Sequence, residues 1–476
     1  MSAAVFERFL STPELLDVFD ERAVLQAMLD FEAALVRAQA AEGLVPAPAA
    51  EVIAGACRVE RIDAGAVVAA SGRAGSLAIP LVKALTGAVA QDDPDAAGYV
   101  HWGSTSQDVI DTALVMSVRR ALALIDRDVG TLVASLLALA ERHGDAPMLG
   151  RTLMQPAQVV SFGFKAVAWI APLVRGQERL RRAGAAALQL QLGGAVGTLA
   201  VMGERGEAVA RRVAAALRLP LPPGAWHTQR DELASLACEV GVLTGTLGKI
   251  ARDVSLMAQG EVGELAEPSG GGRGGSSAMP HKRNPVASMV ALSNALRVPH
   301  RVAALLAAMV QEHERGIGNW QAELAEWASL LASAHGAAKA LADVAGALHV
   351  DAARMRAHID ALQGLVFAEA VSMRLAGRIG KARAHALLEQ WSQQAVREGR
   401  HLRDVTADAL HADAPPADPP LRGIVADDEL AALFDPARAA ARAIVVSAPR
   451  LASLRERARA LDASPPWAAW LPATEH

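Results

Sequence analysis

The sequence contains few of the residues that build metal sites, disulfide frameworks or aromatic recognition surfaces. Among its 476 residues are two cysteines and one tyrosine, and aromatic residues make up only 4%. Cys57 and Cys238 have no metal-ligand spacing and are too few for a disulfide framework. The first twenty residues carry charged side chains throughout and lack the apolar core of a signal peptide. We therefore expect a reduced, cytoplasmic protein without a metal ion.

The sequence also lacks an excess of either charge and a long uninterrupted apolar run. Its 47 basic and 51 acidic residues give a formal charge of −4, which offers no electrostatic basis for binding nucleic acid. Apolar runs stop short of the roughly 18 residues that a membrane span requires. Hydrophobic residues nevertheless make up 52% of the chain. This combination is typical of long helices that are buried on much of their circumference, including against other subunits.

Helical periodicity is the dominant pattern that remains. Apolar residues recur every three to four positions over long stretches, while convincing alternation of the strand type is absent. The pattern predicts an all-α or nearly all-α fold in which five long central segments form a bundle. The main expected helices cover residues 13–41, 109–143, 159–190, 231–267, 286–314 and 320–348. We expect Pro268 to end the third of these central helices, residues 231–267, and Pro299 to kink or break the next one.

Polar residues gather at the junctions between these helices, which places them at the ends of a bundle. The junctions are residues 101–108, 150–156, 192–198 and 267–285. Segment 192–198 is rich in glycine, but no strand precedes it and its spacing does not fit a dinucleotide fingerprint. It is more simply a turn between helices.

The longest junction has the composition of a mobile lid. Glycine occupies every position from 270 to 275 except Arg273, and Ser276, Ser277, Met279, Pro280, Lys282 and Asn284 follow. Flexible hinges around a stiffer tip are what a closing active-site loop needs. Most serines in such loops only cap helices or face solvent, so this remains an open alternative at the level of composition.

The lid sequence carries a family resemblance. Residues 275–285 read GSSAMPHKRNP, which resembles the signature of the fumarase/aspartase superfamily. That superfamily includes argininosuccinate lyase, adenylosuccinate lyase and 3-carboxy-cis,cis-muconate cycloisomerase. The resemblance extends to residues 101–108, 150–152, 194–198 and 228–231, in the same order and spacing, and so covers most of the chain.

The resemblance implies an all-α homotetramer with active sites assembled from three subunits. It implies three parts, an N-terminal helical domain (1–108), a central bundle with the lid (109–349) and a C-terminal helical domain (350–476). Substrates of such enzymes are small carboxylates that pass through an enolate-like dianion, without a metal or organic cofactor. Ser276 matches the residue that exchanges the carbon-bound proton, supported by Lys282 and Asn284. Substrate-binding positions are implied at His101, Ser104, Thr105, Ser106, Arg151, Thr152, Gln155, Gln229, Met279 and Arg315.

One position departs from the lyases of this superfamily. Where they carry a histidine associated with protonating the leaving group, this sequence has Leu153. An amine must be protonated to leave, whereas a carboxylate with a pKa of about 4 leaves unaided. The leucine therefore favours the cycloisomerase branch, in which the group that leaves in the lactone-opening direction is the substrate's own carboxylate. Segments 76–82, 311–316 and 363–370 resemble the same branch.

Two alternatives stay open at this point. The first is a lyase that releases fumarate from an amino-linked succinate, with another acid such as His101 in place of Leu153. The second is a noncatalytic structural homologue of these enzymes.

Overall fold

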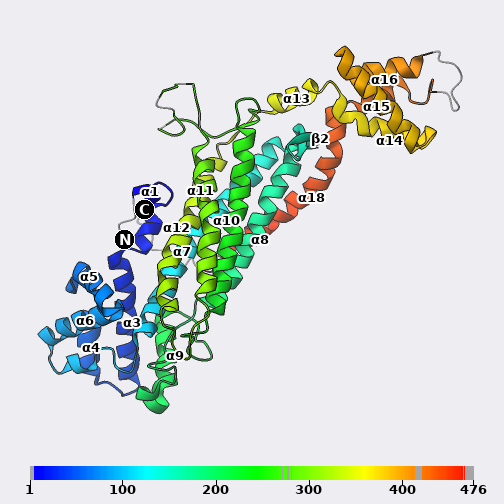
Figure 1. Ribbon diagram of the computed structural model, residues 1–476. Coiled ribbons are helices and arrows are strands. Elements are labelled where there is room, and N and C mark those ends of the chain that lie inside the picture. Colours follow the sequence, from blue (N-terminus) through cyan, green and yellow to red (C-terminus); the bar gives the residue numbers. More distant parts are fainter. Residues whose placement is uncertain are drawn as a thin grey trace.

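The computed structural model describes residues 5–270, 272–275, 278–279, 281–412, 421–464 and 466. The regular secondary structure of the described chain is almost entirely helical, and its strands form two small two-stranded sheets. Figure 1 shows an elongated molecule with the N-terminal helices at one end and a smaller C-terminal group of helices at the other. The prediction of an all-α or nearly all-α fold is confirmed.

A bundle of long helices forms the middle of the molecule (Figure 1). α11 packs against both α10 and α12, α12 packs against α7, and α8 packs against α7 and α10. The longest helix, α7, has 38 residues and a length of about 57 Å at 1.5 Å per residue. The bundle consists of α7 (Ser106–His143), α8 (Phe162–Ala187), α10 (Asp231–Met257), α11 (Val286–Ala307) and α12 (Asn319–Ala345).

The N-terminal helices lie at and near the end of the bundle where α7 begins, with α1 and α2 further along the bundle than the others (Figure 1). They are α1 (Val5–Arg8), α2 (Pro13–Val18), α3 (Glu21–Ala41), α4 (Ala47–Ala56), η1 (Val59–Arg61), α5 (Ala64–Ala74), α6 (Ala78–Asp92) and η2 (Ala96–Tyr99). The single helix expected over residues 13–41 is divided into α2 and α3. The division arises because Asp20 is extended and its carboxylate accepts the Ala23 N–H at 2.8 Å, which starts a new helix.

Residues 147–161 form a hairpin that the sequence pattern did not predict. β1 (Pro147–Thr152) pairs antiparallel with β2 (Gln155–Ser161), and the register shifts between Gly150 and Arg151. The helix expected from about residue 159 therefore begins later, as α8. Its start is set by Ser161, whose hydroxyl oxygen accepts the Phe164 N–H at 3.2 Å.

The ends of α10 and α11 also differ from the ends that the apolar periodicity predicted. α10 ends at Met257 instead of continuing to residue 267, because Gly263 adopts a left-handed conformation and β3 (Leu265–Ala266) turns to pair with β4 (His349–Val350). Pro268 is therefore not the residue that ends α10. α11 ends at Ala307, before residue 314, and continues through Pro299, so that proline does not break it.

The remaining helices connect the bundle to both ends of the molecule. They are η3 (Ala200–Arg205), α9 (Gly206–Leu217), α13 (Ala352–Ala361), η4 (Leu365–Phe367), α14 (Ala368–Ile379), α15 (Lys381–Glu398), α16 (Leu402–His411), α17 (Asp427–Leu433) and α18 (Pro436–Ala463). Phe367, Trp391 and Phe434 belong to a small separate core in the C-terminal group. α18 then returns along α8 and adds Leu454 to the main core. The three-domain boundaries stay a prediction.

One described helix, α10, is long and apolar enough to cross a membrane by length and composition. In the fold, however, this helix lies in the bundle, and Leu236, Leu243 and Leu247 are fully buried there. Its apolar residues are thus those of a core helix.

Candidate active site

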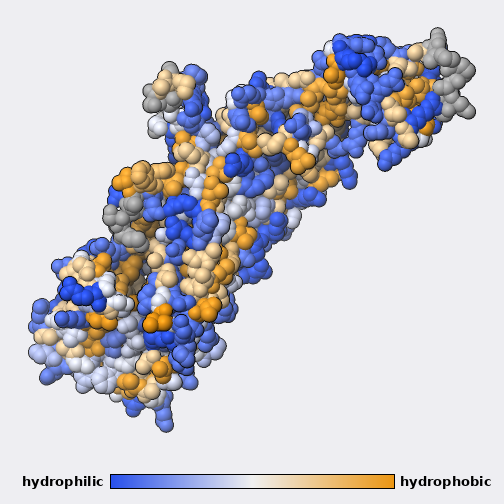
Figure 2. Space-filling model, viewed as in Figure 1, coloured by the Kyte–Doolittle hydropathy of each residue, from blue (hydrophilic) through white to orange (hydrophobic). Residues whose placement is uncertain are grey.

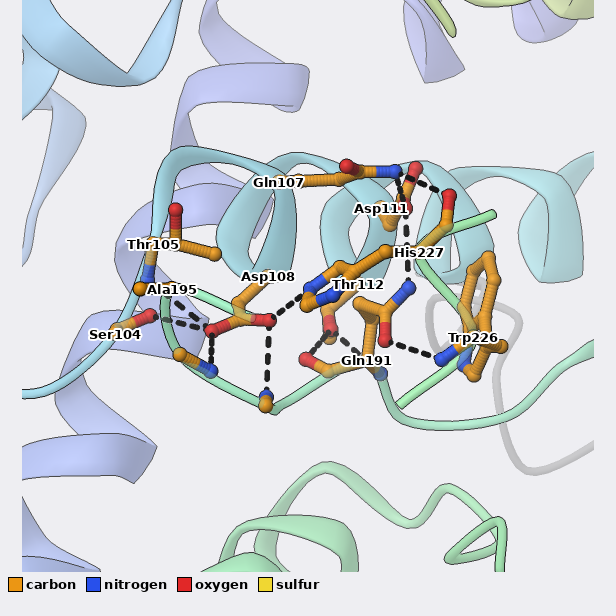
Figure 3. A network of polar contacts seen from close by, with 12 residues as sticks. Ser104, Thr105, Gln107, Asp108, Asp111, Thr112, Gln191, Ala195, Trp226 and His227 are labelled. Carbon is orange, nitrogen blue, oxygen red and sulfur yellow. Dashed lines mark hydrogen bonds and ion pairs between the residues drawn. The ribbon is translucent and has the colours of Figure 1, made fainter. Parts of the chain in front are cut away.

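The N-terminal end of α7 is organised around the buried carboxylate of Asp108 (Figure 3). This carboxylate accepts the backbone N–H of Thr105 at 3.1 Å, of Gly193 at 3.0 Å and of Gly194 at 2.9 Å. His227 Nε2 lies 2.8 Å from the same carboxylate. The glycine segment 192–198 is thus a turn, as predicted, and its amides bind the protein's own carboxylate rather than a phosphate.

Glycine is required in this turn because the chain passes close to its neighbours. A Cβ atom on Gly193 would lie 2.5 Å from the Cβ of Ala225, which is closer than real Cβ atoms approach. Gly194 has a φ of 72°, in the left-handed region that favours glycine. The turn is therefore fixed by packing as well as by Asp108.

A second buried carboxylate, Asp111, lies one turn further along α7 and binds Arg230. The guanidinium of Arg230 donates to Asp111 at 2.8 and 3.2 Å and to Glu323 at 3.0 and 2.6 Å. Trp320 Nε1 donates to Asp111 at 2.9 Å. Burial lowers the pKa of Arg230, but the charges and hydrogen bonds of Asp111 and Glu323 outweigh it and raise the pKa above its ordinary value. This arginine is neutralised by two carboxylates and is fully engaged within the protein.

Several of the predicted substrate-binding residues lie at the start of α7, next to this buried network. Thr105 immediately precedes α7, Ser106 is its first residue, and both are half-buried. Ser104 Oγ donates to Asp108 at 3.4 Å, and Gln229 is exposed on the loop that holds Arg230. The N-terminus of a long helix favours an anion through its unpaired N–H groups and its dipole.

Arg315 reaches the same place from the loop before α12. Its guanidinium donates to the Gln107 side-chain oxygen at 3.3 Å and to the Ala195 carbonyl at 2.7 Å. Both acceptors are neutral. A third acceptor, the Gly194 carbonyl at 3.4 Å, is neutral too, and among the described residues Arg315 forms no ion pair with a carboxylate. Its positive charge is therefore held at the start of α7.

His101 completes this end of the molecule. Its Nδ1 lies 2.6 Å from Oε1 of Glu32, a residue of α3 that is 2% exposed. Burial lowers the pKa of His101, but the charge and hydrogen bond of Glu32, together with the charge of Asp108, raise it above its ordinary value. The structure thus brings six predicted positions to one end of the bundle, namely His101, Ser104, Thr105, Ser106, Gln229 and Arg315.

The predicted residues of segment 150–156 lie on the hairpin at the opposite end of α10. Arg151 forms a bidentate pair with the buried Glu264 at 2.9 and 2.7 Å, and His358 Nδ1 lies 2.8 Å from the same carboxylate. Burial raises the pKa of Glu264, but the bonds from Arg151 and His358 lower it below its ordinary value overall. Thr152 and Gln155 flank the hairpin tip and are exposed.

The tip itself consists of Leu153 and Met154, which are 97% and 69% exposed. Both residues have positive φ angles, 50° and 67°. A two-residue loop with both φ values positive is the type I′ turn, which ordinarily uses Asn-Gly. The hairpin therefore presents two apolar side chains to solvent in a conformation that disfavours them.

The lid is anchored at its base. The Glu267 carboxylate accepts the backbone N–H groups of Ala287 at 2.9 Å and Ser288 at 2.8 Å, and the Ser288 hydroxyl donates to it at 2.7 Å. Further out, the Asn284 N–H donates to the Gly274 carbonyl at 2.9 Å. These contacts tie the first and last parts of the lid together.

The outer residues of the lid are less enclosed. Lys282 is exposed, Met279 is 43% exposed, and the Asn284 side-chain amide is 3.5 Å from the Gly275 carbonyl. Ser276 lies outside the described residues.

The predicted residues do not form one site within a single chain. Arg230 immediately precedes α10, whereas Glu264 and the lid follow it, and the 27 residues of that helix correspond to about 40 Å. The hairpin group and the lid are thus at one end of the bundle, and the group around α7 is at the other (Figure 1).

Several residues of the site were not assigned a role from the sequence. Asp108 and Arg230 lie in segments 101–108 and 228–231, to which the family resemblance extends, but the sequence predicted no role for them or for Glu323, Glu32 or Asp111. A sequence signal did exist for Asp111, because it is a charged residue at a position that the helical period places inside. Glu32 has a similar signal within the apolar pattern of residues 13–41.

Comparison with known proteins identifies the family. A model described as "Lyase" matches residues 7–300, and one described as "Adenylosuccinate lyase C-terminus" matches residues 364–446. The chain belongs to the lyase family. It is a member of the fumarase/aspartase superfamily, as the lid motif predicted.

The relatives of this family member are similar over most of their length. A 3-carboxy-cis,cis-muconate cycloisomerase of Bradyrhizobium diazoefficiens is 49% identical over 427 residues, which are 90% of this chain and 93% of the relative. A nitrosuccinate lyase of Streptomyces davaonensis is 43% identical over 426 residues, 88% of each protein. The crystal structure of 3-carboxy-cis,cis-muconate lactonizing enzyme from Pseudomonas putida is 44% identical, with a TM-score of 0.88, covering 95% of this chain and 99% of that one.

Proposed function

We propose that this protein is a 3-carboxy-cis,cis-muconate cycloisomerase that forms 4-carboxymuconolactone in the protocatechuate branch of the β-ketoadipate pathway. The observation that carries the proposal is the similarity to cycloisomerases over most of the chain. The hairpin tip supports it, because the residue presented there is Leu153, which is 97% exposed and has no proton to donate.

The proposed reaction needs one proton transfer to carbon. A carboxylate oxygen of the substrate attacks the conjugated double bond, a C–O bond forms, and the electron pair moves onto a neighbouring carboxylate as an enolate. Ser276 then delivers a proton to the adjacent carbon, so that the trianion becomes the lactone dianion. Positive charge from Lys282 supports the anionic intermediate and the serine. In the reverse direction the leaving group is a carboxylate, which requires no acid.

Substrate carboxylates would be bound at three places. Thr105 and Ser106 offer the N-terminus of α7, and Arg315 offers N–H groups beyond those used on Gln107 and Ala195. Thr152 and Gln155 would contact the substrate from the hairpin. Arg151 already donates to Glu264 through both terminal nitrogens, so only its other N–H groups would be available to a substrate carboxylate. Asn284 and Met279 would close the site from the lid.

We propose further that the enzyme is a homotetramer in the cytoplasm, with each site built from three subunits. The separation of about 40 Å along α10 supports this proposal, since one chain cannot bring its own groups together. Large apolar residues on the outer faces of α10 and α11 also support it. Val242, Met289, Leu296 and Leu306 are 53%, 49%, 68% and 44% exposed. Figure 2 shows apolar patches along the bundle, as expected for a surface that packs against other copies.

The proposal is tested by following the ultraviolet absorbance of the conjugated diene in 3-carboxy-cis,cis-muconate without added cofactor. We expect turnover by the wild type and a loss of at least about a hundredfold in kcat for Ser276→Ala, because the proton donor is removed. Folding of the variant is checked by circular dichroism.

Three outcomes would contradict the proposal in different ways. Efficient cleavage of argininosuccinate or adenylosuccinate without turnover of the muconate would favour the lyase alternative. The match of residues 364–446 to the adenylosuccinate lyase C-terminus is the observation on its side. Turnover of nitrosuccinate instead would place the protein with the relative of that name. A folded wild type that is inert toward all of them would favour the noncatalytic alternative.

A further inference from the structure

The contact between Glu32 and His101 is unusual in its backbone and in its burial. His101 has a φ of 58°, a left-handed conformation that few residues other than glycine adopt. Its side chain is 16% exposed, while that of Glu32 is 2% exposed. The chain therefore holds His101 in an unfavourable backbone conformation, with one ring edge against a buried carboxylate and some of the ring accessible.

Electrostatics makes the two residues dependent on each other. A buried carboxylate is costly unless a cation or several donors compensate it. Among the described residues, His101 is the only ion-pair partner of Glu32. The charged groups that act on His101 are Glu32 from α3 and Asp108 from α7, and both are negative. This pairing favours the imidazolium over the neutral ring.

The other edge of the ring remains available. The Nδ1 edge faces Glu32, and Nε2 has no hydrogen bond to any residue in the described part of the chain. The neighbouring cation Arg230 is neutralised by Asp111 and Glu323. His101 and Arg315 are consequently two cations beside the start of α7 that can meet an anionic ligand.

We infer that Glu32 is a positioning residue for substrate binding, which keeps His101 charged and directs its Nε2–H toward a substrate carboxylate. This inference rests on the proposed function. Without the Glu32 charge, burial would lower the pKa of the His101 ring and favour its neutral form. A neutral ring can present the Nε2 lone pair to the substrate, which repels a carboxylate. Loss of the His101 charge should therefore weaken substrate binding and raise KM. It should affect kcat less, because the proposed proton transfer to carbon is made by Ser276 of the lid.

The test compares the pH dependence of KM in Glu32→Gln and wild type. In the wild type, KM should rise only when the pH passes the raised pKa of His101. In Glu32→Gln the burial effect remains without the carboxylate, so the rise should begin at lower pH. We expect roughly a tenfold higher KM at pH 8 and a smaller difference at pH 6, with a smaller change in kcat, because one charged hydrogen bond is lost.

Three further comparisons separate this role from a structural one. Glu32→Asp keeps the charge on a shorter side chain and should restore part of the difference. Glu51→Gln removes an exposed carboxylate from the adjacent α4 and should leave KM unchanged. On a His101→Gln background, Glu32→Gln should cause no further shift in the pH profile.

An identical pH dependence of KM in wild type and Glu32→Gln would overturn the inference. Additive effects of Glu32→Gln and His101→Gln in the double variant would overturn it as well. If Glu32→Gln does not fold, the comparison of wild type with His101→Gln decides, because the high-pH rise in KM must disappear. If the wild type does not turn over the muconate, nitrogen NMR of ¹⁵N-histidine-labelled protein still tests the pair. A His101 pKa that is unchanged in Glu32→Gln would then refute it.

Discussion

At the residue scale, the end of the bundle where α7 begins contains buried charges that neutralise one another. Arg230 is 2% exposed and forks onto Asp111 and Glu323, both buried. The guanidinium also lies 4.8 Å from the centre of the Trp226 ring. Such a pair contributes less than its short distances suggest, because desolvation offsets much of the attraction. Removing one member is strongly destabilising, because the other charges stay buried without compensation.

We therefore predict that Arg230→Met is strongly destabilising. Two buried carboxylates would lose their common cation, and the free energy of unfolding should fall by about 3–5 kcal/mol. Urea denaturation measures the change. Arg211→Met on α9 is the control, because Arg211 forms only an exposed pair with Glu207 at 3.7 Å and its loss should cost under about 1 kcal/mol. Equal effects of the two substitutions would contradict this interpretation.

At the element scale, the β1–β2 hairpin is the most strained part of the candidate site. Its two-residue tip places Leu153 and Met154 in the left-handed region, which costs an L-residue other than glycine roughly 1–2 kcal/mol. Asn-Gly would form the same type I′ turn with less strain. A tip that keeps exposed apolar side chains in this conformation is expected to have a function that compensates the strain.

Replacing Leu153 by Asn together with Met154 by Gly should separate stability from activity. The substitution relieves the turn, so the free energy of unfolding should rise by about 1 kcal/mol. It also removes the two exposed apolar side chains of the tip, which we expect to contact a neighbouring subunit in the proposed oligomer, so kcat/KM should fall. Urea denaturation and the diene assay measure the two effects. Unchanged activity would contradict a role for the tip, and Val445→Asn on α18 controls for loss of an exposed apolar side chain.

At the scale of the whole molecule, the length of α10 limits how an active site can be assembled. Its 27 residues separate the α7 end from the lid and hairpin end by about 40 Å. Because the bundle is rigid and closely packed, no local motion of one chain closes that distance. Antiparallel copies of the chain would place the two ends side by side, which is the arrangement that closed oligomer symmetry permits.

Mixing two inactive variants tests this arrangement directly. Ser276→Ala is defective in the lid, and Thr105→Ala is defective at the start of α7. If a site takes these residues from different subunits, hybrid oligomers formed by co-expression should contain intact sites. About a quarter of the sites would carry both native residues after random 1:1 assembly. Activity near that of the separate variants, despite hybrid formation shown by mass spectrometry, would mean that one chain supplies both residues.

Much of the fold could be predicted because helices are specified locally. The period of apolar residues predicted α7 and α12 nearly to their ends, since successive turns of a helix depend on neighbouring residues. Helix ends were less predictable. The division at Asp20 and the start of α8 at Ser161 depend on single capping bonds, and the end of α10 depends on pairing of β3 with β4, more than eighty residues further on.

The sequence by itself determined the family, the helical class and the polar segments that carry the chemistry. These follow from short motifs and from periodicity, which are local properties of the chain. Only the tertiary structure decided which charges meet. The contacts of Arg230 with Asp111 and Glu323 join residues 119 and 93 positions apart, and Glu32 meets His101 across 69 positions. Those pairs exist because bundle packing brings distant helices together at one end, where burial gives each carboxylate its effect on the neighbouring cation.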